Sequence, residues 1–494
     1  EILGARECDN QPGGIENVEE HRRKVGEDFY RGYQVSWWNF WYKGQVLRRN
    51  QNGNISIYIS EVAKGELPYD DRVGCVAIYH QPGSGGTTTA RQVLWDNRVI
   101  YPCLVVRKIT NQTCSQICKI RSYPGEENIQ VPIVLVDNAD EEKLASLKEA
   151  LEDEARKSGQ RVFCVLLVCY RRTLLPFEKI EKYISLKQEI SKEEQHWFQQ
   201  KYQDLMSKYK QKKGINPNHL ISLNIMKENF NSECISHTVN EFLRELGPSE
   251  HYLLKAISLV NTYDLDFNPI PISCFDPIMI RRVYVPNKHH HQNIGKKWDQ
   301  RLGPALLVLL TRTEQPQMGR KLKSLRISNP LLSKEILNQI LKTDGQTLGE
   351  AFQQFLSCPI FLLSHSGNGI LIKVLQTMMR KREWDVQGKE ARPKTFSPLV
   401  QTLVDSGDAN HALDIMKTTF GLTNDDPMIA QQIARLYNHL ELWKEAEKYA
   451  DLACQLRPNN SFLKHTMGQI YKSRLLKIYQ EHMEKKSNLD QQSA

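Results

Sequence analysis

The sequence predicts an α/β parallel-sheet domain followed by helical domains and a C-terminal array of paired helices. Three observations lead to this prediction. Apolar runs alternate with segments of helical spacing in the first half of the chain, which is typical of parallel βαβ units. A glycine-rich turn follows the first strong apolar run. Near the C-terminus, small residues recur with a period of about 34 residues, as in stacked helical hairpins.

The composition is that of an ordinary folded protein. The chain has 494 residues, of which 40% are hydrophobic and 25% charged, and a formal net charge of +9, so three or four domains are expected. We expect no membrane span and no signal peptide, because no apolar run is long enough and the first residues lack the required pattern. The eleven widely spaced cysteines favour reduced thiols and a cytoplasmic location. The missing initiator methionine suggests a fragment of a longer protein.

The glycine-rich turn is the centre of the predicted site. Val73–Tyr79 reads as a buried parallel strand, and Thr87–Trp95 reads as the helix that follows it. Between them, glycines allow backbone N–H groups to converge on an anion, and the helix N-terminus adds partial positive charge. We therefore expect the phosphates of ATP or ADP to bind at Gly83, Ser84, Gly85, Gly86, Thr87 and Thr88.

The turn resembles the P-loop pattern G-x-x-x-x-G-K-[ST] but departs from it twice. Thr87 aligns with the hydroxyl that holds magnesium, whereas Gly86 replaces the lysine and His80 replaces the first glycine. The lysine places a full charge against the terminal phosphates, so its loss is expected to impair hydrolysis more than binding. The domain is expected to be a P-loop NTPase-like fold and at most a weak ATPase, without an assigned catalytic residue.

Further apolar runs predict the rest of the sheet. The second to fifth strands are expected at Pro102–Val106, Val131–Asp137, Arg161–Tyr170 and Leu220–Met226, with helices at 112–121 and 140–157 and a charged helical stretch at 176–213. We also expect a turn at Asn50–Asn54 and a strand at Ile55–Ile59, where isoleucines alternate with polar residues.

Two strand ends add to the predicted site. Asp137 would lie at the C-terminal edge of the sheet, where it either holds magnesium with Thr87 or caps the next helix. Asn138 follows it where hydrolysing enzymes carry an acid, which again predicts slow turnover. Arg171 and Arg172 end the fourth strand and either contact the terminal phosphate in place of the lysine or pair with a neighbouring helix.

Aromatic and basic clusters allow two interpretations each. The aromatic segment Val35–Tyr42 is expected to pack as a hydrophobic plug, with base stacking as the alternative. The basic run Lys208–Lys213 is expected to be a solvated helix end, with binding of nucleic acid or of an acidic partner as the alternative.

The second half of the chain is expected to be helical. A helix, a polar hairpin at 311–323 and a second helix at 333–341 suggest a winged-helix domain. Ala434, Tyr437, Ala446 and Ala453 fall at tetratricopeptide spacings, and such repeats offer a concave surface to proteins. The predicted divisions are a linker (1–34), the nucleotide-binding domain (35–230), a helical domain (231–300), a winged-helix-like domain (301–345), a helical connector (346–394) and the repeats (395–494).

Three motifs together resemble the sterile alpha motif domain-containing protein 9 family: Val35-Ser-Trp-Trp-Asn-Phe40, His80-Gln-Pro-Gly-Ser-Gly-Gly-Thr-Thr88 with Leu94-Trp-Asp96, and Ile133-Val-Leu-Val-Asp137. The resemblance covers most of the chain, and the turn without lysine is part of the family pattern. The wider class is that of signal-transduction ATPases with numerous domains, whose nucleotide state selects between a closed monomer and an oligomer.

The resemblance implies a cytoplasmic, interferon-linked antiviral protein that restrains translation and growth and is a target of poxviral antagonists. Its nuclease-like effector precedes the nucleotide domain, and nothing in this chain matches that effector. The implied partners are the protein's own effector and autoinhibitory domains, a second copy and a protein ligand on the repeats. One departure is Asn329, which stands where many switches of the class carry a histidine that contacts the bound diphosphate.

Three functions are weighed from the sequence. The first is a nucleotide-gated oligomerisation switch that binds ATP or ADP with magnesium at Thr87 and Asp137. The second is a scaffold with a vestigial phosphate loop. The third is direct binding of nucleic acid through the basic run and the wing, which is the least favoured.

Overall fold

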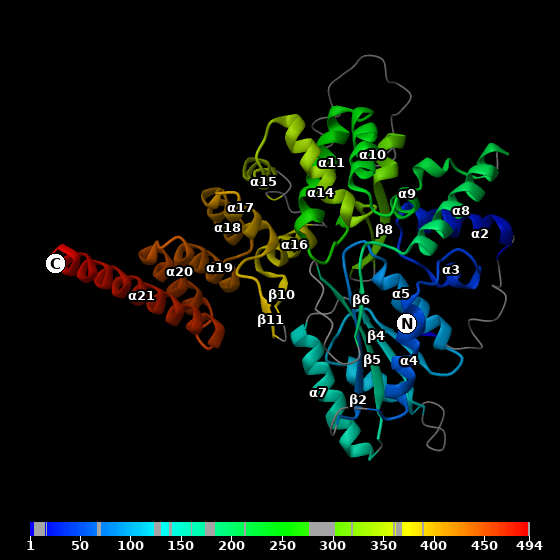
Figure 1. Cartoon of the computed structure of the whole chain (residues 1–494), viewed down its shortest axis with the longest axis horizontal. Coiled ribbons are helices and arrows are strands. Elements are labelled where there is room, and N and C mark those ends of the chain that lie inside the picture. Colours follow the sequence, from blue (N-terminus) through cyan, green and yellow to red (C-terminus); the bar gives the residue numbers. More distant parts are fainter. Residues whose placement is uncertain are drawn as a thin grey trace.

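The structure is a computed structural model, in which a sheet domain lies below a group of central helices and an array of helices extends from these to the left (Figure 1). It describes residues 1–3, 15, 17–66, 71–122, 130–137, 141–159, 161–172, 183–211, 214–275, 302–317, 320–358, 361, 368–387 and 390–492. Among these residues, no helix combines the length and the apolar character that crossing a membrane requires.

The first half of the chain forms a six-stranded sheet with the order β1-β3-β4-β5-β2-β6. Its strands are β1 (Ile2–Leu3), β2 (Val73–His80), β3 (Cys103–Val106), β4 (Ile133–Asp137), β5 (Cys164–Arg171) and β6 (Tyr183–Leu186). All neighbouring pairs are parallel except β1 with β3. The C-terminal ends of β2, β4 and β5 therefore meet at one edge, which is where the predicted site residues lie.

Helices cover both faces of this sheet. On one face, α4 (Gln51–Ala63) and α5 (Gly86–Asn97) pack on alternate strand residues such as Ile78 and Leu135. On the other face, α6 (Thr113–Arg121) and α7 (Glu141–Ser158) pack on the intervening residues such as Val134 and Leu166. The predictions of four parallel strands and of the helices after β2, β3 and β4 are confirmed.

The predicted fifth strand is wrong. The apolar run at 220–226 forms helix α9 (Ile221–Lys227), in which Ile221 and Ile225 are buried one turn apart. The fifth parallel strand is β6, which lies in the stretch expected to be helical. Helix α8 (Lys192–Lys210) occupies the rest of that stretch. A short apolar run is compatible with both a helix and a strand, so its periodicity alone does not decide between them, and the tertiary contacts do.

The strand predicted at Ile55–Ile59 is also wrong, and so is the turn before it, because both lie in α4. Ile55 and Ile59 are fully buried, whereas Ile57 is 55% exposed. The alternating isoleucines resemble a strand, but Ile55 and Ile59 lie four residues apart on one face of a helix and point to the sheet.

This geometry gives a direct test. Ile59→Ala is expected to lower the free energy of unfolding of the sheet domain by about 3 kcal/mol, because it leaves a cavity against the sheet. Ile57→Ala is expected to change it by less than about 0.5 kcal/mol. Urea unfolding followed by circular dichroism measures both. Equal losses would contradict the helical packing.

The described residues of the predicted N-terminal linker include a strand and a helix, so the linker interpretation is wrong for them. Leu3 joins the sheet through β1, and α2 (Val18–Arg31) is a helix capped by Asn17 and Gly32. Its buried Tyr30 donates a hydrogen bond of 2.5 Å to the carbonyl oxygen of Gln45.

The aromatic segment packs as a plug. Its core is α3 (Trp37–Trp41), where Phe40 is buried against Trp95 of α5 with ring centroids 6.1 Å apart. Arg91 of α5 lies 5.3 Å from the Trp37 ring and donates to the carbonyl oxygen of Val35. The hydrophobic interpretation of this segment is therefore confirmed.

The centre of the molecule holds a three-stranded sheet with the order β7-β9-β8 and several helices. The predicted hairpin is present as β8 and β9, and helices flank it on both sides, whereas the winged-helix assignment stays a prediction. The elements are α10 (Ser232–Arg244), α11 (Pro248–Tyr263), β7 (Ile270–Pro271), α13 (Pro304–Leu309), β8 (Leu310–Gln317), β9 (Arg320–Ile327) and α14 (Pro330–Asp344).

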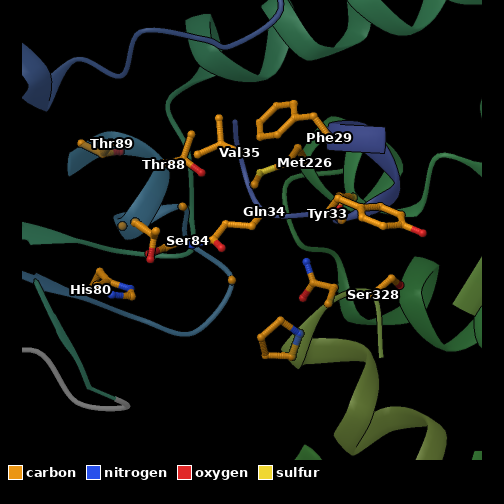
Figure 2. Close-up of a pocket in the computed structure, with 18 of the residues that line it drawn as sticks. Phe29, Tyr33, Gln34, Val35, His80, Ser84, Thr88, Thr89, Met226 and Ser328 are labelled. Carbon is orange, nitrogen blue, oxygen red and sulfur yellow. The ribbon is translucent and has the colours of Figure 1, made fainter. Parts of the chain in front are cut away.

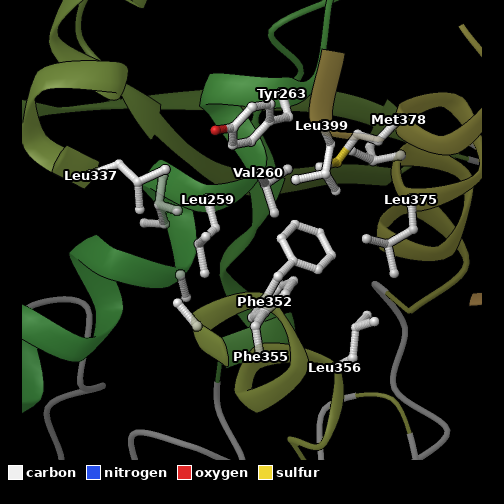
Figure 3. Close-up of a cluster of buried hydrophobic side chains, with 14 of the residues drawn as sticks. Leu259, Val260, Tyr263, Leu337, Phe352, Phe355, Leu356, Leu375, Met378 and Leu399 are labelled. Atoms are coloured by element: carbon white, nitrogen blue, oxygen red, sulfur yellow. The ribbon is translucent and has the colours of Figure 1, made fainter. Parts of the chain in front are cut away.

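The chain then continues as helices to its end. These are α15 (Leu348–Leu356), α16 (Asn368–Arg380), the hairpin β10 (Trp384–Gln387) and β11 (Glu390–Pro393), α17 (Pro398–Asp405), α18 (Ala409–Leu422), α19 (Pro427–His439), α20 (Trp443–Leu456) and α21 (Ser461–Gln492). Figure 3 shows Phe352 and Leu399 meeting Val260 of α11 in a core that continues into the repeats.

The small residues of the predicted repeats lie where helices pack. Ala434, Ala446 and Ala453 are buried, and Tyr437 stacks on Tyr449 with ring centroids 5.7 Å apart. Tyr471, in the slot that the repeat would place next, is 48% exposed on α21. The tetratricopeptide assignment and the domain boundaries stay predictions.

Candidate functional site

A pocket of about 370 Å³ lies at the C-terminal edge of the parallel sheet. The glycine-rich turn forms its polar side, where His80 and Ser84 are seen in Figure 2. Phe29, Val35 and Met226 form an apolar side across from it. A volume in this range and a polar end facing an apolar end suit a ligand of nucleotide size.

The turn has the backbone that an anion cradle requires. Gly83 and Gly85 adopt φ values of +79° and +86°, in the left-handed region that glycine favours. Gly86 then begins α5, so the turn ends on the N-terminus of a twelve-residue helix. Ser84 is buried, and its carbonyl oxygen accepts a hydrogen bond of 2.8 Å from Arg49, which holds the turn in place. Gly83 to Thr88 all line the pocket, as predicted.

Thr87 and Asp137 meet at the sheet edge. The Thr87 hydroxyl donates a hydrogen bond of 3.2 Å to a carboxylate oxygen of Asp137. A hydroxyl and a carboxylate side by side provide the oxygen ligands that magnesium prefers, so the two residues fit the predicted metal site. Among the described residues, no group of three or more His, Cys, Asp or Glu side chains offers another metal site. Asn138 lies outside the described residues.

His80 fills the space that a lysine at position 86 would need. A Cβ atom built on Gly86 would lie 2.2 Å from Cγ and 2.3 Å from Cδ2 of the His80 ring. His80 is 6% exposed, its Nδ1 lies 3.2 Å from the carbonyl oxygen of Gln81, and within the described part of the chain its buried Nε2 has no hydrogen-bond partner. Burial lowers the pKa of His80, although Asp137 opposes this shift. The glycine at position 86 and the histidine at position 80 are therefore linked, because the histidine ring occupies the space of a side chain at position 86.

The two arginines at the end of β5 differ in their surroundings. Arg171 lines the pocket, and within the described part of the chain its buried Nη2 has no hydrogen-bond partner. Burial lowers its pKa, while Asp266, Asp264 and Asp137 oppose this shift. Arg172 instead forms an ion pair with Glu141 at the start of α7 and is not among the residues that line the pocket. This favours the alternative of pairing with a helix, and the phosphate contact of Arg172 stays a prediction.

The central unit closes the pocket and supplies a second cation. Arg326 of β9 lines the pocket, donates to the carbonyl oxygen of Gly32 at 3.3 Å and lies 5.5 Å from the ring of Phe267. Burial lowers its pKa, and the nearby Arg171 lowers it further. No feature of the sequence distinguishes Arg326 from the other basic residues of this polar hairpin.

Asn329 stands at the N-terminus of α14 and faces the turn. Its side chain caps the helix by accepting from the backbone N–H of Leu331 at 2.9 Å. A Cβ atom on Gly83 would lie 3.3 Å from its Oδ1 and 3.2 Å from the Leu331 side chain. The turn and the central unit are thus in direct contact at the place where many switches of the class carry the histidine.

Comparison with curated proteins confirms the resemblance seen in the sequence. The chain is 28% identical over 500 residues to the sterile alpha motif domain-containing protein 9-like of Mus musculus. It is 25% identical over 476 residues to the human sterile alpha motif domain-containing protein 9 and 25% identical over 474 residues to the human 9-like protein. These matches cover 96%, 92% and 92% of this chain but only 30%, 29% and 29% of the relatives, so the chain spans less than a third of their length. No family model matches it.

Two solved structures also show a distant similarity. Cdc6p from Pyrobaculum aerophilum has 10% identity and a TM-score of 0.26, and the match covers 64% of this chain and 98% of that chain. The Drosophila ORC bound to DNA has 15% identity and a TM-score of 0.24, with coverage of 60% and 96%.

Proposed function

We propose that this chain is the nucleotide-binding switch of a larger protein. The observation that supports this best is the contact of Thr87 with Asp137 beneath a glycine-rich turn whose backbone faces an open pocket. In this proposal, ATP or ADP places its phosphates on Gly83 to Thr88, Thr87 and Asp137 hold magnesium, and Arg171 contacts the terminal phosphate. The base lies against Phe29, Val35 and Met226.

The switch would act through the contact between the turn and α14. Gly83 lies so close to α14 that a Cβ atom on it would be 3.3 Å from Asn329 and 3.2 Å from Leu331, so a terminal phosphate that changes the turn would change how the central unit packs. The repeats continue the same hydrophobic core, so they would move with it. By the family resemblance, the output would be control of a growth-restricting, antiviral effector that lies outside this chain, in the cytoplasm. A second copy, autoinhibitory domains, a protein ligand of the repeats and poxviral antagonists are the proposed partners.

Hydrolysis is expected to be weak at most, because no lysine can enter from position 86 while His80 occupies its space. A scaffold without bound nucleotide is the second candidate, and the same observation favours it. Binding of nucleotide separates the two functions.

A matched pair of substitutions tests nucleotide binding. A side chain at Gly85 would meet no atom within 4 Å, and both aspartate and asparagine tolerate its left-handed backbone. Gly85→Asp is expected to weaken ADP and ATP binding at least about tenfold relative to Gly85→Asn, because only the carboxylate repels phosphate. Isothermal titration calorimetry of both variants and the wild type measures this.

Thr87→Ala provides a second arm, since it is expected to weaken binding in the presence of magnesium and to change little in its absence. If the wild type binds neither nucleotide at millimolar concentration, the scaffold function replaces the switch. Equal nucleotide affinities of Gly85→Asp and Gly85→Asn would show that the phosphates do not bind at the glycine-rich turn.

A further inference from the structure

A second, larger cleft separates the sheet domain from the repeats. It has a volume of about 1180 Å³ and lies between the ends of β3 and β4 on one side and α16, α19 and α21 on the other. Asp137 and Asp266 line both this cleft and the smaller pocket, so the two spaces adjoin at the sheet edge. Eight lysine or arginine side chains but only three carboxylates line it, and the cleft is therefore strongly basic.

Half of these basic side chains lack a carboxylate partner. Arg107, Arg380 and Lys381 pair with acids, and Lys143 makes a further interaction. The others form no ion pair with any residue in the described part of the chain, and they are Lys108, Arg382, Arg435 and Arg457. Unpaired positive charges that converge on one space favour an anionic ligand.

Arg435 and Arg382 are the least exposed of these four residues. Burial and, to a smaller extent, the neighbouring Arg382 together lower the pKa of Arg435 to about 10. Among the described residues, Arg382 itself donates only to a backbone oxygen, that of Lys394, at 3.3 Å. Two guanidinium groups held near each other without a counter-charge destabilise the folded chain, and a phosphate between them would remove that penalty.

The repeat helices add neutral donors and an aromatic ring. Gln431 and Arg435 on α19, and His465 and Gln469 on α21, lie one turn apart and face the same cleft. Phe462, at the start of α21, lines the cleft as well, and 66% of its surface is exposed. An exposed ring beside arginines is the arrangement on which unpaired bases stack.

We propose that this cleft binds single-stranded nucleic acid, with phosphates on Lys108, Arg382, Arg435 and Arg457 and a base on Phe462. An acidic peptide would use the charges but has no need of a flat exposed ring. The basic run at the end of α8, considered from the sequence, is a poorer candidate. Lys208 is paired with Asp204 on an exposed helix, and residues 212 and 213 lie outside the described chain.

Fluorescence anisotropy with labelled oligouridine and oligothymidine of about 12 nucleotides tests the proposal. The whole chain is used, with Gly85→Asp to keep the oligonucleotide out of the nucleotide pocket. Four unpaired cations predict that log K falls with log salt with a slope of about −2.8. Arg435→Gln combined with Arg457→Gln is expected to weaken binding at least about tenfold and to reduce the slope to about −1.4.

Two further variants separate stacking from charge. Phe462→Ala is expected to weaken binding by about fivefold or more without changing the salt slope, because the ring carries no charge. Lys208→Gln combined with Lys210→Gln removes the same charge from α8 and is expected to leave binding unchanged.

Three results would overturn the proposal. These are no binding at low salt, equal losses from the α8 and cleft variants, and displacement of the oligonucleotide by poly-glutamate of the same charge at equal concentration. The last result would assign the cleft to an acidic protein segment instead.

Discussion

Replacing Gly86 with lysine is expected to weaken ATP and ADP binding at least about 100-fold, although it restores the residue that P-loops carry at this position. Such a loss corresponds to about 2.7 kcal/mol. Gly86 has no left-handed backbone and begins a helix, so lysine would be favourable there on local grounds. The whole penalty comes from the His80 ring, which would lie 2.2 Å from the new Cβ, a separation that forces the ring or the turn to move.

The double variant His80→Gly with Gly86→Lys is the matched control, because it removes the ring and restores both consensus residues. The double variant is expected to bind ATP and ADP at least as tightly as the wild type. The affinity of His80→Gly alone is expected to lie between those of Gly86→Lys and the wild type. The coupling free energy from this cycle is expected to exceed about 2 kcal/mol. Calorimetric titrations of the four proteins, each checked by circular dichroism, give the result. If Gly86→Lys binds like the wild type, the ring does not hold this space.

The polar side of the pocket could be predicted from the sequence, and its apolar side could not. Gly83, Gly85 and Thr87 lie in one local motif, and Asp137 ends an apolar strand, so strand periodicity and turn chemistry were enough to bring them together. Phe29, Val35 and Met226 come from segments whose relation depends on tertiary packing. Two of them lay outside any expected regular structure, and the third lay in a strand that proved to be a helix.

The sequence shows both departures from the P-loop pattern but not the reason for them, which is the burial of the His80 ring. His80 and Gly86 were each recognised as unusual, yet nothing in the sequence shows that one ring enters the space of the other side chain. Similarly, Arg171 and Arg172 are equivalent in the sequence. The structure separates them because consecutive strand residues point to opposite faces, and only Arg172 reaches Glu141 on α7.

Gly32→Ala is expected to lower the free energy of unfolding by about 3 kcal/mol or more, one of the largest effects available at a surface turn. Gly32 caps α2 with a φ of +106°, and a Cβ atom there would lie 2.3 Å from the backbone oxygen of Ser328 and 3.0 Å from the Ser222 hydroxyl. A backbone atom cannot rotate away as a side chain can. The substitution must therefore separate α2 from the loop between β9 and α14, which also breaks the bond from Arg326 to the Gly32 oxygen.

Gly44→Ala separates backbone strain from this contact. Gly44 also has a positive φ, of +81°, but a Cβ atom there meets nothing within 4 Å, so about 1 kcal/mol of strain is expected. Thermal unfolding and limited proteolysis compare the two variants. If the nucleotide pocket depends on the packing of α2 against the central unit, Gly32→Ala must also weaken nucleotide binding while Gly44→Ala leaves it unchanged. Equal stability of the two variants would mean that α2 and the central unit are not held together at Gly32.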